Sequence, residues 1–226
     1  MKLQFLGTGA ADWPSDPAKC EGGFRRNASA LLDEAILIDP GPGVLNAFET
    51  FGVDVGKIRC VINTHKHGDH FCRATLDYLA AHSIPFIDMK AGEKLRLDEY
   101  EITAYRANHG TCTDAVHFLI TDGKSKLYYA LDSAWLYYEE YIAIKTAKID
   151  YLVLDATVGH AEGDFRIFEH NNLRMVLEMQ KTLKKYVKRF CISHMAYTLH
   201  DPHEVLVKDM EPYGVEVAAD GMIVEF

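Results

Sequence analysis

The segment that most constrains this chain is THKHGDH at residues 64–70, which directly follows an apolar run at 60–63. In an extended segment, residues two apart point the same way, so His65 and His67 can present two imidazoles to one cation. Gly68 permits a sharp turn, after which Asp69 and His70 face the same space. One tetrahedral ion would not take three imidazoles and a carboxylate from one loop. The segment therefore predicts two adjacent metal ions, and a solvated, histidine-rich turn is the alternative.

Three more residues of metal-ligand type each follow a strand-like run. His109 follows the run at 100–107, Asp132 the run at 126–131, and His194 the run at 190–193. Taken singly, they could be a turn residue, a helix N-cap and a buried core histidine. If the strand ends meet at one edge, seven side chains converge, namely His65, His67, Asp69, His70, His109, Asp132 and His194. Asp39, which follows the run at 35–38, could orient a ligand histidine or cap the turn at Pro40.

The hydrophobic pattern predicts alternating short strands and helices. The predicted strands are 3–6, 30–32, 35–38, 60–63, 100–107, 116–121, 126–131, 151–154, 190–193 and 222–225. The predicted helices are 44–51, 72–82, 136–147, 173–188 and 203–210, and Gly123 marks a hairpin turn. Early strands follow one another closely and later ones are separated by helices, which predicts an α/β protein with two packed sheets and outer helices. Its 226 residues contain no repeat or linker, so one domain spanning 1–226 is expected.

The charge balance, the length of the apolar runs and the cysteines indicate which partners and which compartment to expect. The chain has 24 Lys and Arg against 33 Asp and Glu, a formal charge of −9. A broad nucleic-acid surface is not expected, because neutralising phosphates needs a basic face. No apolar run approaches the roughly 18 residues of a membrane span. The five cysteines include no CxxC pair, which argues against a disulfide framework and favours a cytoplasmic protein.

These residues together resemble the metallo-β-lactamase superfamily over essentially the whole chain. The resemblance depends on LGTG at 6–9, Asp39, the 65–70 motif, and the three later ligand candidates in the family's order. It implies an αββα four-layer sandwich with the site on one edge. It also implies how the ligands divide: one metal would be held by His65, His67 and His109, the other by Asp69, His70 and His194, and Asp132 would bridge the two.

Within the superfamily, the chain is similar to the branch of tRNase Z and the phosphonate-metabolism cyclic phosphodiesterase. RRNAS at 25–29 resembles both, which makes Asn27 a candidate substrate contact, and DGM at 220–222 resembles the phosphodiesterase. LVLDAT at 152–157 resembles a tRNase Z motif in which Asp155 takes a supporting Glu position and Leu154 replaces a histidine. His170 then matches the family's proton donor. The departure at Leu154 and the lack of a tRNA-clamping arm favour a small phosphodiester, cyclic or linear, over the substrate of a tRNase Z-like RNA endonuclease.

The expected activity is a dinuclear metal-dependent phosphodiesterase. Two ions about 3.5–4 Å apart can share a water and lower its pKa, so that a bridging hydroxide attacks phosphorus. The candidate catalytic residues are Asp69 and His170, with Asp155 orienting His170, which would protonate the leaving alkoxide. His160, His200 and His203 are competing donors in predicted loops, and His200 is also a candidate substrate contact.

Several alternatives stay open. Imidazole and carboxylate ligands suit zinc, manganese or iron. A thioester or lactone hydrolase could use the same metals. A binding module that has lost catalysis is disfavoured, because all seven ligand positions are filled. A small phosphodiester is the expected partner, without nucleic acid or membrane, and a homodimer is the commonest assembly for such a chain.

Overall fold

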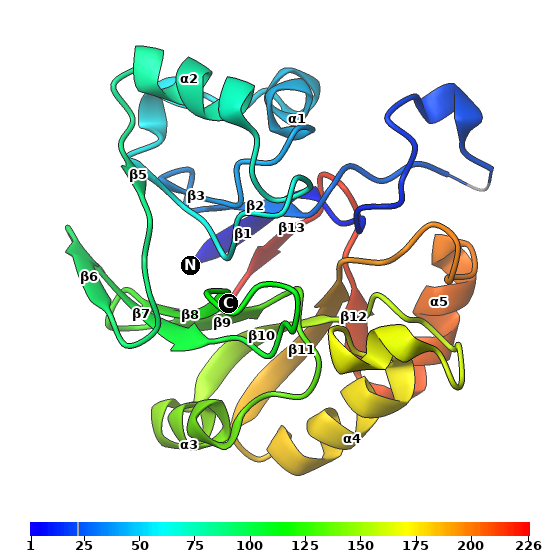
Figure 1. Cartoon of the computed structure of the whole chain (residues 1–226). Coiled ribbons are helices and arrows are strands. Elements are labelled where there is room, and N and C mark those ends of the chain that lie inside the picture. Colours follow the sequence, from blue (N-terminus) through cyan, green and yellow to red (C-terminus); the bar gives the residue numbers. More distant parts are fainter. Residues whose placement is uncertain (22) are drawn as a thin grey trace.

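Two β-sheets pack face to face, and helices cover both outer faces (Figure 1). The computed structural model describes residues 1–21 and 23–226. The first sheet has the order β13-β1-β2-β3-β4-β5, and its strands are Ile223–Glu225, Lys2–Gly7, Ser29–Leu32, Ile36–Ile38, Cys60–Ile62 and Phe86–Ile87. The second has the order β12-β11-β10-β9-β8-β7-β6, with strands Val215–Val217, Val187–Ser193, Ile149–Asp155, Lys126–Ala130, Val116–Thr121, Tyr100–Arg106 and Lys94–Leu97.

The connections explain which strands are parallel. Short turns join β2 to β3, β6 to β7 and β8 to β9, while residues 8–28 connect β1 to β2 and residues 107–115 connect β7 to β8. All of these neighbours pair antiparallel. Parallel neighbours need a longer crossover, usually a helix. Five helices make those crossovers, namely α1 (Val44–Phe51), α2 (Arg73–Ala81), α3 (Tyr138–Ala147), α4 (Leu173–Leu183) and α5 (His203–Met210). The predicted hairpin turn at Gly123, whose φ is 84°, joins β8 to β9.

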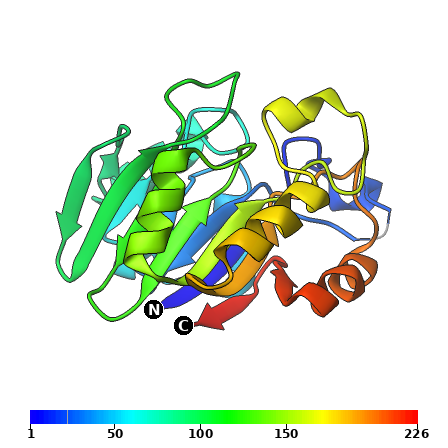
Figure 2. The same ribbon diagram turned by 90° about the horizontal axis from the view of Figure 1, so that it is seen from below.

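Strand β10 shows how the alternation of side chains builds both layers of the core. Tyr151 and Val153 are buried between the two sheets, while Leu152 and Leu154 are buried under the helices that cover the second sheet. A strand covered on both faces has apolar residues at successive positions, as this one does. In Figure 2, α3 and α4 lie across the outer face of the second sheet. Helices α1 and α2 pack in the same way on the first sheet through Phe48 and Leu79.

The predicted αββα sandwich is therefore what the structure shows, but the helix predicted at 173–188 is wrong beyond Leu183. The chain turns there, Tyr186 donates its backbone N–H to Leu183 O, and β11 begins at Val187. Val187 is β-branched, buried and paired with Ile149 of the parallel strand β10, and this tertiary pairing outweighs the helical spacing. Strands β5, β6 and β12, which the pattern did not predict, are short and lie at or near sheet edges.

The two chain ends meet at the edge of the first sheet, where β13 pairs with β1. The amino group of Met1 donates to the carbonyl of Phe226 at 3.0 Å, and both ends lie together in Figures 1 and 2. Of the helices in residues 1–21 and 23–226, none combines the length and apolar character that crossing a membrane requires.

Candidate metal centre

The predicted ligands follow the ends of strands that come from both sheets. The motif at 65–70 follows β4, His109 follows β7, Asp132 follows β9 and His194 follows β11. Three residues just after strands have left-handed backbones, with φ of 61° at Asp39, 58° at Asp132 and 63° at His194. Asp and His tolerate this conformation better than β-branched residues do. The turns that it makes possible are typical of functional sites.

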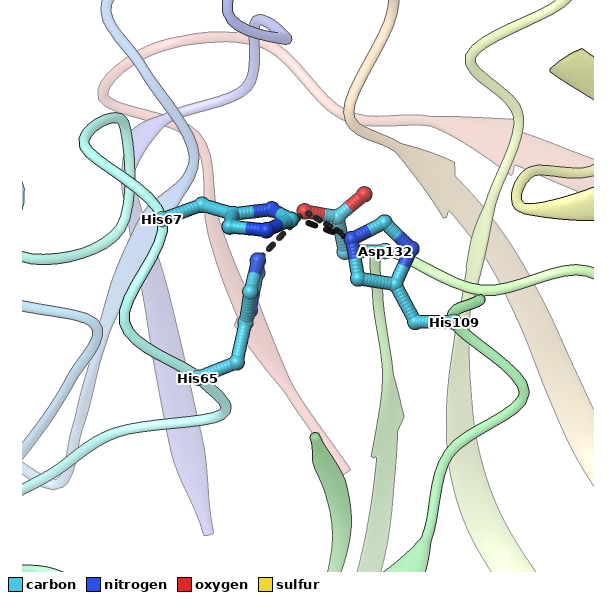
Figure 3. Close-up of side chains that lie close together, drawn as sticks. All are labelled: His65, His67, His109 and Asp132. Carbon is cyan, nitrogen blue, oxygen red and sulfur yellow. Dashed lines mark hydrogen bonds and ion pairs between the residues drawn. The ribbon is translucent and has the colours of Figure 1, made fainter. Parts of the chain in front are cut away.

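One group of donors consists of His65, His67, His109 and Asp132, whose ligand atoms all lie within 4.8 Å of one another. Figure 3 shows the three rings directed towards the Asp132 carboxylate. His65 Nε2 lies 3.0 Å from Asp132 Oδ2, and His109 Nε2 lies 4.0 Å from the same oxygen. His109 Nε2 is also 3.1 Å from His67 Nδ1.

A second group consists of Asp69, His70, His194 and the same Asp132, again within 4.8 Å. His70 Nε2 lies 3.1 Å from Asp132 Oδ2 and 3.3 Å from Asp69 Oδ2. His194 Nε2 lies 3.3 Å from Asp69 Oδ2. The structure thus brings all seven predicted side chains together, with Asp132 common to both groups as a bridging ligand would be. Their assignment as ligands remains a prediction.

Asp39 fixes His70 from outside the donor groups. The fully buried Asp39 carboxylate accepts from Thr64 N at 2.7 Å and Thr64 Oγ1 at 2.9 Å, and its Oδ2 lies 2.9 Å from His70 Nδ1. A carboxylate only accepts, so His70 carries a proton on Nδ1 and can turn an Nε2 lone pair towards Asp132. Of the two roles considered for Asp39, the structure therefore shows a side chain that orients a histidine.

Asp155, at the end of β10, supports the other side of the centre. It is fully buried and accepts from the backbone N–H groups of Thr157 and Asn171 at 3.0 and 2.9 Å. Its Oδ2 lies 3.2 Å from His170 Nδ1 and 3.3 Å from His194 Nδ1. His170 Nδ1 is also 3.0 Å from Asp132 Oδ1, so His170 lies directly beside the shared carboxylate.

Burial and neighbouring charges keep some side chains of the cluster in the deprotonated form that binds metal and favour the protonated form of others. Burial would raise the pKa of Asp69 and Asp132, but the neighbouring histidines outweigh it and lower the pKa of both carboxyls. Burial lowers the pKa of His65 and His109, which favours their neutral, metal-binding form. Burial lowers the pKa of His194, but the carboxylates of Asp132, Asp155 and Asp69 outweigh burial and raise this pKa to about 9.

His170 is similarly influenced by its two carboxylate neighbours. Burial lowers the pKa of its imidazole, but Asp155 and Asp132 outweigh burial and raise it to about 11. The imidazolium is therefore the favoured form of this side chain in the absence of another cation.

The donor set fits divalent cations. Asp132 Oδ1 and His65 Nε2 are shielded from solvent without a well-formed hydrogen bond, and His70 Nε2 faces His194 Nε2 at 3.1 Å. At most one of two facing imidazole nitrogens can donate, whereas both can bind a metal ion. Buried polar atoms are costly without partners, and a cation would supply one. Nitrogen and carboxylate donors suit zinc, manganese and iron alike.

A cavity of about 190 Å³ opens over the cluster. Of the residues considered for catalysis and substrate contact, His170 and Asp69 line it. Asn27 instead donates its amide to Ala10 O at 3.0 Å. His200 and His203 line an adjacent cavity of about 290 Å³, and His160 is exposed beside Asp209. The described lining of the metal cavity includes none of these four side chains.

Sequence reasoning missed several residues of the site. Thr157 Oγ1 lies 2.7 Å from His194 Nδ1, Thr64 Oγ1 lies 3.0 Å from His65 Nδ1, and Arg166 lines the cavity. The two threonines each lie within two residues of a predicted site residue, which could have signalled them. Arg166 has no such signal, because its position depends on the fold of the 156–172 loop.

Comparisons with known proteins agree with this fold. Residues 23–76 match the model of the metallo-beta-lactamase superfamily. The chain is similar over its whole length to the structure of the metallo-beta-lactamase fold protein YhfI from Bacillus subtilis, at 18% identity and a TM-score of 0.76, covering 99% of that chain. It is likewise similar over its whole length to a diphosphatase from the PhnP family (20% identity, 96% of that chain, TM-score 0.75) and to the short form of human tRNase Z (18%, 99%, 0.72). No curated protein sequence matches the chain.

The chain therefore has the metallo-β-lactamase fold, and its resemblance to that superfamily is confirmed. Proteins of this superfamily are metal-dependent hydrolases, and the chain combines their fold with a candidate metal-binding cluster of histidines and aspartates.

Proposed function

We propose that the protein is a dinuclear metal-dependent phosphodiesterase acting on a small phosphodiester. The observation that carries the proposal is the position of His170, which borders the cavity beside the shared Asp132 and is held by Asp155. Bound in the two donor groups, divalent ions would activate a water and neutralise charge on the phosphoryl group. Zinc, manganese and iron are the candidates.

Each residue has a distinct task in this proposal. The seven donors would hold the ions, and Asp39 and Asp155 would fix the rings of His70 and His194. Asp69 would also face the reacting water from the cavity wall. His170 would donate a proton to the leaving alkoxide, a step that thioesters, with their better leaving group, need less. The similarity to a PhnP-family diphosphatase and to tRNase Z supports phosphoester chemistry.

The test is hydrolysis of bis(p-nitrophenyl) phosphate by protein reloaded with manganese or zinc. We expect metal-dependent turnover that His67→Ala abolishes. His82→Ala, which removes an exposed histidine at the end of α2, is the matched control and should leave turnover unchanged. Turnover would justify a screen of cyclic nucleotides and cyclic sugar phosphates. A protein that binds both metals without any turnover would contradict the proposal and leave lactones and thioesters to be tested.

A further inference from the structure

The cavity of about 190 Å³ over the donor groups, called here the metal cavity, is lined by one basic side chain that has no role in the proposed reaction. Among the described residues that line the cavity, Arg166 is the single Lys or Arg. The acidic residues of the same lining are Asp12, Asp69, Asp132 and Glu169. A guanidinium in such surroundings adds positive charge next to carboxylates that would repel an anionic substrate.

Asp164 holds this guanidinium in a fixed orientation. Its Oδ1 accepts from Arg166 Nε at 2.9 Å and from the Arg166 backbone N–H at 2.9 Å, and its Oδ2 accepts from Nη2 at 2.7 Å. Within residues 1–21 and 23–226, Nη1 has no hydrogen-bond partner. A planar guanidinium bound along one edge loses little further freedom when its remaining N–H groups bind an oxygen.

Arg166 and His170 belong to one short structural unit. Asp164 caps the 3₁₀ helix Phe165–Phe168, and the carbonyl of Arg166 accepts from the backbone N–H of His170 at 2.8 Å and of Glu169 at 2.9 Å. The unit therefore brings a guanidinium and an imidazole to the same cavity. Both side chains are types that interact with phosphate oxygens.

A purely structural ion pair is the alternative role for Arg166. Arg174 and Glu162 form such a pair, with their side chains 80% and 76% exposed. Exposed pairs of that kind contribute little to stability. The Arg166–Asp164 pair differs, because its side chains are only 35% and 16% exposed and Arg166 borders the metal cavity.

We propose that Arg166 binds a non-bridging phosphate oxygen of the substrate through Nη1, with Asp164 as its positioning residue. This inference rests on the proposed phosphodiesterase function and extends it. The site then selects anionic phosphoesters over neutral lactones and thioesters, since a neutral substrate gains little charge attraction from the guanidinium and offers no anionic oxygen to Nη1.

The test compares metal-loaded wild type with Arg166→Ala, Arg166→Lys, Asp164→Asn and the control Arg174→Ala. Two quantities are measured: the Kd for inorganic phosphate by calorimetry, and KM and kcat for bis(p-nitrophenyl) phosphate. Loss of a hydrogen bond to a charged group should raise Kd and KM about 10- to 100-fold in Arg166→Ala, with a smaller change in kcat. Arg166→Lys should bind phosphate more tightly than Arg166→Ala but more weakly than wild type, because lysine keeps the positive charge but lacks the planar set of guanidinium N–H donors. Asp164→Asn should weaken affinity less than Arg166→Ala, and Arg174→Ala should match wild type.

An unchanged phosphate Kd in Arg166→Ala would overturn the inference. So would a variant that loses metal or falls in kcat alone, because Arg166 would then arrange the loop rather than bind substrate. The proposed function fails separately. Wild type that binds phosphate through Arg166 but hydrolyses no diester contradicts the phosphodiesterase, whereas diester turnover with a KM independent of Arg166 contradicts this inference alone.

Discussion

Asp39→Asn tests whether the residues around the donor groups control metal binding. The substitution keeps the size of the side chain and removes the charge that faces His70 Nδ1 at 2.9 Å. The Asn oxygen can still accept from Thr64 N, which lies 2.7 Å from Oδ1 of the wild-type side chain. The group that remains opposite His70 is then neutral or a competing N–H donor, so the ring is less well oriented and less basic.

Loss of such a partner typically weakens metal binding about 10- to 100-fold, or about 1.4–2.7 kcal/mol. We expect that loss at the site containing His70 and His194, and little change at the site containing His65, His67 and His109. The metal-dependent gain in unfolding free energy should fall by a similar amount at fixed metal concentration.

Competition with a chromogenic chelator measures the two affinities separately, and thermal unfolding with and without metal gives the stability difference. Asp33→Asn is the matched control, because Asp33 accepts two hydrogen bonds at the β2–β3 turn, from Lys2 N and Tyr100 Oη. Equal weakening of metal binding at both sites, or no weakening at either, would show that Asp39 does not act through His70.

Three further predictions concern the core, the pH dependence of stability and the proton donor. Phe118→Ala, in the fully buried layer between the sheets, should cost about 3–5 kcal/mol in chemical denaturation. Burial lowers the pKa of His200 from 6.5 to about 4, so unfolding binds a proton below pH 6.5. Unfolding free energy should therefore fall from pH 6.5 to 4 by up to about 3 kcal/mol, and His200→Gln should lose that component. His170→Gln should lower kcat about 100-fold or more for a nucleoside cyclic phosphate but much less for bis(p-nitrophenyl) phosphate, whose leaving group needs no proton; equal losses would argue against His170 as the donor.

Local sequence patterns predicted most of the fold, because the local and tertiary preferences of most segments agree. Helices 44–51 and 203–210 and strand 116–121 have the predicted bounds. The helix predicted at 173–188 failed where parallel pairing with β10 took Val187 into a strand. Strand β6, with its KLRL sequence and alternately exposed side chains, depends on pairing with β7 rather than on a local apolar run.

The residues of the site also differ in how far the sequence could predict them. Its seven donors follow strand ends, so a pattern that locates strands also locates them. The sequence left two roles open for Asp39, because the choice between them depends on where His70 lies after the turn at Gly68. Arg166 could not be found at all, since only the folded 156–172 loop brings it to the cavity. Contacts between loops that are distant in sequence leave no periodic signal.

A titration of metal-free protein with zinc or manganese, in which bound metal and phosphodiester turnover are followed together, tests whether a dinuclear centre carries the activity. We expect two ions per chain and turnover that rises with occupancy. The His67→Ala variant should lose one ion and the turnover. Saturation at fewer than two ions, or full turnover in His67→Ala, would show that the activity does not depend on a dinuclear centre.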